Sequence, residues 1–113
     1  MAIHYLEVVS DDVPATVTLF TRVHGVDFST VPEFGPAEVA TLGDGTLLGV
    51  RAPLADHESP IVRTYLAVEN IQAAVEAAQE AGATLAFGPM PLGEQGTFAI
   101  CILGALEQGY WQR

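Results

Sequence analysis

Tyr5-Leu6-Glu7-Val8 recurs as Tyr65-Leu66-Ala67-Val68 at an offset of 60 residues. Both phrases are typical of β-strands, and an apolar pattern with helical spacing follows each of them. The apolar positions of the two patterns correspond in order: Val13, Val17 and Phe20 in the first copy, and Ile71, Val75 and Ala78 in the second. Because a strand and an amphipathic helix recur in the same order, the sequence predicts an internal duplication.

Each predicted helix begins after a polar residue and ends at a glycine. Asp11-Asp12 precede the first helix and Gly25 follows it, whereas Asn70 and Gly82 bracket the second. Strand-like segments come next, and we expect them at residues 26–30, 37–42 and 46–52 in the first copy and at residues 83–87, 97–103 and 108–112 in the second, with a loop at 88–96.

This order predicts a single α+β domain, residues 1–113, built from tandem β-α-β-β-β units. The first unit spans residues 1–52 and the second spans residues 61–113, with a linker at 53–60 that has proline at both ends. A helix covers only one face of a four-stranded sheet, so we expect the curved mixed sheets to enclose an apolar cleft. A symmetric homodimer is the expected assembly.

Composition narrows the classes of function. The 113 residues carry 14 Asp and Glu against 4 Lys and Arg, for a net charge of −10, which disfavours nucleic acid and anionic membrane surfaces as partners. Cys101 is the only cysteine, which excludes an intrachain disulfide and a cysteine-based zinc cluster. The chain begins without the basic segment of a signal peptide and has no apolar run of membrane-spanning length, so we expect a cytoplasmic protein.

Three phrases carry a resemblance to a known family. Leu19-Phe20-Thr21-Arg22-Val23-His24-Gly25 closes the first helix, Val68-Glu69-Asn70-Ile71 opens the second, and Gly109-Tyr110-Trp111-Gln112 ends the last strand. Together with the tandem units, these phrases resemble the vicinal oxygen chelate superfamily of glyoxalases, bleomycin-resistance proteins and extradiol dioxygenases. The resemblance covers nearly the whole chain. These phrases are more specific for the fold than for a reaction. They leave open whether the protein is an enzyme, for example a lyase or an isomerase.

Metal-dependent members of that superfamily hold one divalent ion with His or Glu side chains from the first and last strands of each unit. The corresponding positions here are Tyr5, Gly49, Arg63 and Gly109, none of which is a usual ligand. The resemblance therefore implies a member without the metal cofactor. If the register is wrong by one residue, His4 faces the cleft instead, and the alternative is a metal-dependent glyoxalase, lyase or extradiol dioxygenase that uses one divalent ion.

Strand alternation starting from Tyr5 selects the side chains that face the expected cleft. They are Glu7, Leu47, Arg51, Arg63, Tyr65, Glu107 and Trp111. We expect a metal-independent site for a small organic molecule, where an arginine grips a carboxylate or enolate oxygen and the aromatic rings form its walls. In an enzyme, Glu7 or Tyr5 would act as the general base. One alternative is that the charged residues form only structural ion pairs at the rim of the cleft. Another is that the chain is only a dimerising structural subunit whose cleft is filled by side chains.

Overall fold

The structure, a computed structural model, describes residues 1–113 and divides into two compact units. Tyr5–Val62 form one unit, called here the N-terminal unit. Arg63–Arg113 together with Met1–His4 form the other, called the C-terminal unit. Neither of the two α-helices is long and apolar enough to cross a membrane.

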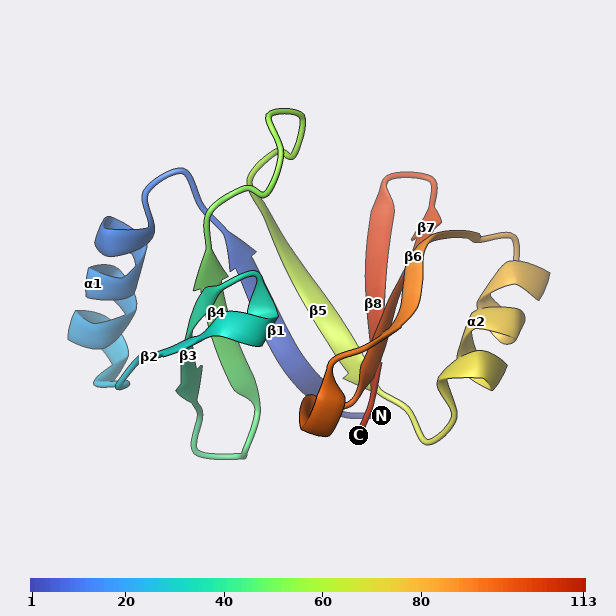
Figure 1. The fold of residues 1–113 in the computed structure, drawn as a ribbon, viewed down its shortest axis with the longest axis horizontal. Coiled ribbons are helices and arrows are strands. Elements are labelled where there is room, and N and C mark those ends of the chain that lie inside the picture. Colours follow the sequence, from blue (N-terminus) through green and yellow to red (C-terminus); the bar gives the residue numbers. More distant parts are fainter. The chain divides into compact units, whose positions relative to one another are not determined.

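The N-terminal unit has one four-stranded sheet and one α-helix (Figure 1). Its elements are β1 (Ile3–Val9, which begins in the other unit), α1 (Val13–His24), β2 (Ser29–Val31), the short 3-10 helix η1 (Pro32–Phe34), β3 (Ala37–Thr41) and β4 (Leu47–Arg51). The strands lie in the order β2-β3-β4-β1. β1 and β4 pair in parallel, and the other pairs are antiparallel.

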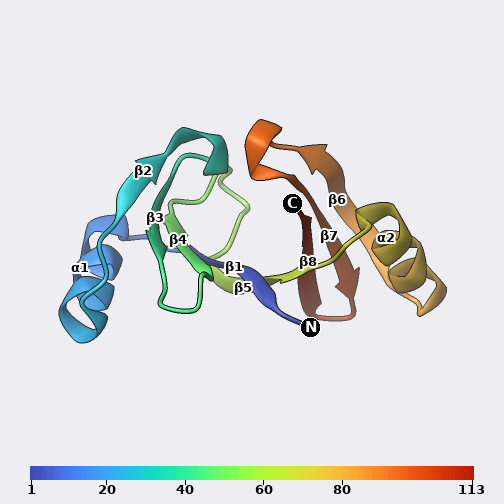
Figure 2. The same cartoon turned by 90° about the horizontal axis from the view of Figure 1, so that it is seen from below.

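The C-terminal unit repeats this topology. Its elements are β5 (Ile61–Ala67, which begins in the other unit), α2 (Ile71–Glu80), β6 (Thr84–Pro91), the 3-10 helix η2 (Gly93–Gln95), β7 (Thr97–Leu103) and β8 (Leu106–Gln112). The strands lie in the order β5-β8-β7-β6, with β5 and β8 parallel and the other pairs antiparallel. In each unit the helix lies on one side of its own sheet (Figure 2). The predicted α+β class and the tandem β-α-β-β-β units are confirmed.

The helix starts agree with the capping residues of the sequence. The Asp12 side chain accepts a hydrogen bond from the Ala15 N–H at 3.0 Å, and the Asn70 side chain accepts one from the Ala73 N–H at 3.0 Å. Each bond satisfies a donor that the first helical turn leaves unpaired. Gly25 ends α1 in the left-handed conformation, with φ of 66°, which glycine adopts without steric cost.

The two helices differ in how deeply they pack. Ile71 and Val75 of α2 are buried, and they form a core with Ala99 and Cys101 of β7. Burial raises the pKa of the Cys101 thiol, which keeps it protonated. In contrast, α1 has no buried residue. Its predicted apolar positions are half-buried, and Leu19 and Val23 on the same helix are exposed.

The strand boundaries differ most from the prediction at β2 and β6. The expected strand at 26–30 is the shorter β2, Ser29–Val31. The expected loop at 88–96 is wrong for its first part, because β6 continues to Pro91. Two register shifts in the pairing of β6 with β7 accommodate this segment. An edge strand tolerates prolines and bulges because one side of its backbone has no strand partner, so the Gly88-Pro89 signal did not end the strand.

Candidate ligand-binding faces

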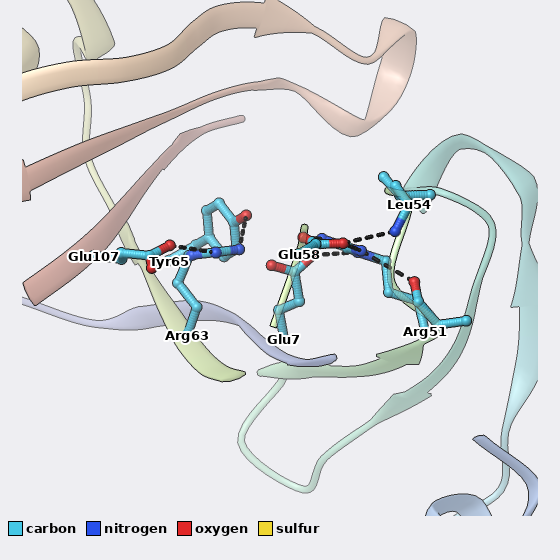
Figure 3. A network of polar contacts seen from close by, with 8 residues as sticks. Glu7, Arg51, Leu54, Glu58, Arg63, Tyr65 and Glu107 are labelled. Atoms are coloured by element: carbon cyan, nitrogen blue, oxygen red, sulfur yellow. Dashed lines mark hydrogen bonds and ion pairs between the residues drawn. The ribbon is translucent and has the colours of Figure 1, made fainter. Parts of the chain in front are cut away.

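In the N-terminal unit, an ion pair joins the first strand to the last. Tyr5, Glu7 and Arg51 are each buried, with 2%, 5% and 6% of their surface exposed. The Arg51 Nε–H donates to Glu7 Oε2 at 2.9 Å (Figure 3). A buried charge needs such a partner, because its desolvation would otherwise cost several kcal/mol. The structure therefore brings together Glu7 and Arg51, which the sequence analysis assigns to one face.

Glu58 provides a second carboxylate, which accepts hydrogen bonds from the two terminal nitrogens of the Arg51 guanidinium. Arg51 Nη1 and Nη2 donate to Glu58 Oε1 and Oε2, each at 2.8 Å. The hydrogen bonds that Arg51 donates to Glu58, together with the charge of Glu7, raise the pKa of Arg51 above its ordinary value, against the opposing effect of burial. Arg51 is therefore a permanent cation that two carboxylates share.

The C-terminal unit has its own buried arginine, on the first strand instead of the last. Arg63 is 6% exposed, and its Nη2 donates to Glu107 Oε1 at 2.7 Å. Its Nη1 also donates to the Tyr65 hydroxyl at 3.4 Å (Figure 3). Because Arg63 and Tyr65 are two residues apart on β5, their side chains project from the same face of the strand.

Aromatic rings cover the same face of the C-terminal sheet. The Trp111 and Tyr65 rings meet edge to face with centroids 5.6 Å apart, and Trp111 stacks on Phe98 at 5.7 Å. Phe98 in turn stacks on Phe87 at 5.5 Å. Trp111 is buried, and its indole N–H donates to the Gln95 carbonyl oxygen at 2.8 Å, whereas Phe87 is 48% exposed. The ladder of Trp111, Phe98 and Phe87 thus runs from the interior of the unit to its surface.

His4 lies beside this ladder. Its ring centroid is 5.0 Å from that of Trp111. Burial, together with the positive charge of Arg113, lowers the pKa of His4. The His4 imidazole is consequently neutral at pH 7, and its ring packs against the Trp111 indole.

Some site residues were not found from the sequence. Glu58 belongs to the segment that we interpreted as a linker, where nothing indicated that it reaches Arg51. Phe98 could have been assigned to the same face as Trp111, because the two residues lie opposite each other in the antiparallel pairing of β7 with β8. Leu47, which the sequence did select, is half-buried and pairs with Tyr5 in the strand register.

In each unit, a tyrosine of the first strand lies against a glycine of the last strand. A Cβ added at Gly49 would overlap the hydroxyl end of the Tyr5 ring, and a Cβ added at Gly109 would overlap the Tyr65 ring near its Cγ and Cδ2 atoms. Only glycine leaves room for these rings. The two pairs are related by an offset of 60 residues, as are the repeated sequence phrases.

These residues do not fit the metal site that the family resemblance implies. The four positions hold Tyr5, Gly49, Arg63 and Gly109: two glycines without ligating side chains, a tyrosine packed over one of them, and an arginine paired with Glu107. In residues 1–113, no three His, Cys, Asp or Glu side chains group closely enough to hold a metal ion. The side chains at these positions thus lack the imidazole and carboxylate donors that such a site requires.

Comparison with known proteins shows which solved structures have a similar fold. No protein-family model and no curated protein sequence matches the chain. A hypothetical protein from Bacillus halodurans has a TM-score of 0.78 at 9% identity, covering 99% of this chain and 94% of that one. Methylmalonyl-CoA epimerase from Mycobacterium tuberculosis has a TM-score of 0.73 at 12% identity, covering 97% and 86%.

A third similar structure is methylmalonyl-CoA epimerase from Streptomyces coelicolor in complex with 2-nitronate-propionyl-CoA. Its TM-score is 0.68 at 11% identity, with 97% of this chain and 95% of that chain covered. The similarity extends over nearly the full length of both chains, although the identities are low. The chain therefore has the fold of the methylmalonyl-CoA epimerases.

Proposed function

We propose that this protein binds a small organic molecule bearing a carboxylate or enolate oxygen, without a metal ion, on the aromatic face of the C-terminal unit. The observation that carries the proposal is the position of Arg63. A buried guanidinium and the Tyr65 ring project from one face of β5, and that ring contacts Trp111. Such a site offers one cation for an anionic oxygen and flat apolar walls for the rest of the molecule.

The energetics favour an anionic group at Arg63. A charge-assisted hydrogen bond to a guanidinium is about twice as strong as a neutral one, and its planar donors match both oxygens of a carboxylate. Aromatic walls add the burial of apolar surface. In this proposal Arg63 selects the charge of the ligand, and Tyr65 and Trp111 select its shape.

Charge also narrows the class of ligand. Two epimerase structures with the same fold contain acyl derivatives of coenzyme A, which are 2-nitronate-propionyl-CoA in one and methylmalonyl-CoA in the other. This chain has 14 acidic residues and 4 basic ones. Because the acidic chain would repel the phosphates of coenzyme A, we propose a small organic acid without phosphate groups.

Binding, not catalysis, is the function that we propose. The two candidate general bases already have structural contacts: Glu7 accepts a hydrogen bond from Arg51, and Tyr5 lies against Gly49. A homodimer is part of the proposal, and light scattering after size-exclusion chromatography would measure the mass of the assembly.

Trp111 is the only tryptophan in the chain, so its fluorescence reports on the proposed site directly. We would titrate the protein with small aliphatic and aromatic carboxylates and with the corresponding amides. Carboxylates should change the emission saturably and bind at least tenfold more tightly than the amides. Equal affinity for both series would contradict the proposal.

Two variants and one metal experiment complete this test. Arg63→Met should abolish the preference for carboxylates, whereas Arg22→Met, which removes an exposed arginine from α1, should leave it unchanged. Native mass spectrometry, with a chelator and then with excess zinc, nickel, manganese or ferrous ion, measures metal uptake. One tightly bound metal ion per chain, or ligand binding that requires metal, would overturn the metal-independent proposal.

A further inference from the structure

The Arg51 network in the N-terminal unit contains a carboxylate that originates from a segment without helix or strand. Glu58 lies within residues 52–60, between β4 and β5. We propose that Arg51 and the Leu54 N–H form a carboxylate-binding site, that Glu58 fills this site as an internal occupant, and that an external carboxylate can displace it. The proposal concerns a different arginine from Arg63 and does not depend on what Arg63 binds.

The donors around Glu58 match the geometry of a carboxylate. Oε1 accepts from Arg51 Nη1 at 2.8 Å and from the Leu54 N–H at 2.7 Å, while Oε2 accepts from Arg51 Nη2 at 2.8 Å. The parallel pair of guanidinium bonds is the two-pronged arrangement by which arginine recognises carboxylates. Three donors thus converge on the two oxygens, and nothing in this geometry requires the carboxylate to belong to the chain.

Arg51 also makes contacts that do not involve Glu58. Its Nε–H donates to Glu7, and Nη1 donates to the Ala52 carbonyl oxygen at 3.2 Å. The backbone of Gly35 packs closely against the Arg51 side chain, since a Cβ added at Gly35 would lie 2.9 Å from Arg51 Cδ. Arg51 is therefore oriented by contacts that remain when Glu58 leaves, so the site is preorganised for another carboxylate.

Glu58 is the more exposed of the two carboxylates on Arg51. Its side chain is 22% exposed, against 7% for Glu7. Exchanging Glu58 for an external carboxylate keeps the number of charge-assisted hydrogen bonds unchanged. The tethered Glu58 competes with an effective concentration on the order of millimolar or above, as for short flexible linkers. The unmodified protein should consequently bind simple carboxylates weakly, and removing Glu58 should strengthen that binding.

The experiment is a chemical rescue with acetate as the probe. Glu58→Ala should unfold at a lower temperature than the unmodified protein. Sodium acetate should raise its midpoint more than sodium chloride at equal ionic strength or acetamide at equal concentration. Glu94→Ala, which removes an exposed acid from η2, is the matched control and should show no rescue specific to acetate. Acetate should bind Glu58→Ala at least tenfold more tightly than the unmodified protein.

Nuclear magnetic resonance locates the bound acetate. In Glu58→Ala, the Leu54 amide and the Arg51 Nε–H signals should shift saturably with acetate and should not shift with acetamide. The double variant Arg51→Met/Glu58→Ala should lose the rescue. If that variant does not fold, the two signals in Glu58→Ala decide the question alone. Absence of saturable shifts, or equal effects of acetate and acetamide, would overturn the proposal, and neither outcome affects the Trp111 titration that tests Arg63.

Discussion

The two units share their backbone features but differ in how they place charge. Each has a tyrosine of the first strand against a glycine of the last and a side-chain cap at its helix. Each also has an arginine–glutamate pair separated by 44 residues in sequence. The order of that pair is reversed, however, since the arginine lies on the last strand in the N-terminal unit and on the first strand in the C-terminal unit.

The two units also differ in how their helices and sheets are packed. The C-terminal unit buries Ile71 and Val75 of its helix and stacks aromatic rings on the opposite sheet face. The N-terminal unit leaves every residue of α1 at least partly exposed, and it instead ties Arg51 to two carboxylates. Close backbone approaches and caps are thus common to both units. The polar side chains differ, because a buried charge requires only some partner within reach and not one particular partner.

The largest expected effect comes from filling the glycine positions. Gly49→Ala and Gly109→Ala should each destabilise the protein by about 3 kcal/mol, because overpacking displaces a buried ring. Tyr5→Leu should relieve Gly49→Ala, since it removes the distal ring atoms that the new Cβ meets. Tyr65→Leu should not relieve Gly109→Ala, because leucine retains Cγ and Cδ atoms. Double-mutant cycles in urea measure the coupling energies, and equal coupling in both units would contradict this difference.

A smaller effect should separate the two ion pairs. Glu7→Ala leaves a buried Arg51 with a partner missing and should cost about 3 kcal/mol. Glu107→Ala removes a carboxylate whose side chain is 36% exposed, so water replaces it and the cost should be about 1 kcal/mol. Urea unfolding at pH 7 gives both free energies. A larger loss for Glu107→Ala would show that the C-terminal pair is the more important one.

The helices provide a third contrast. Val75→Ala removes two methyl groups from the α2 core, where Val75 is 2% exposed, and should destabilise by about 2 kcal/mol. Val17→Ala acts on the half-buried face of α1 and should cost about 0.5 kcal/mol. Both substitutions change helix propensity equally, so they serve as matched controls. Equal losses in thermal and urea unfolding would show that α1 is packed as firmly as α2.

The smallest effect is a dependence on pH that belongs to the C-terminal unit. Since the folded state lowers the pKa of His4 below 6.5, unfolding takes up a proton there. The contribution of His4 to stability is therefore complete above pH 6.5 and is lost as the pH falls from 6.5 through the lowered value. His4→Gln should flatten the pH dependence of the urea-unfolding free energy between pH 8 and pH 5. An unchanged slope in His4→Gln would contradict this assignment.

Local patterns predicted the repeated architecture well. The helices begin after Asp12 and Asn70 as the capping signals indicated, and β7 spans the predicted residues 97–103. The prediction failed along β6, where the glycine and prolines that suggested a loop lie in an irregular edge strand. Edge pairing depends on the neighbouring strand, which a local pattern does not contain.

For the candidate sites, the sequence by itself determined which side chains share a strand face, because alternation has a fixed period of two residues. It thereby placed Glu7 with Tyr5 and Arg63 with Tyr65. Only the tertiary structure decided the partners: Arg51 with Glu58, the stacking of Phe98 on Trp111, and the tyrosine rings over Gly49 and Gly109. These contacts join segments that are distant in sequence, and their geometry depends on strand register and on the path of an irregular segment.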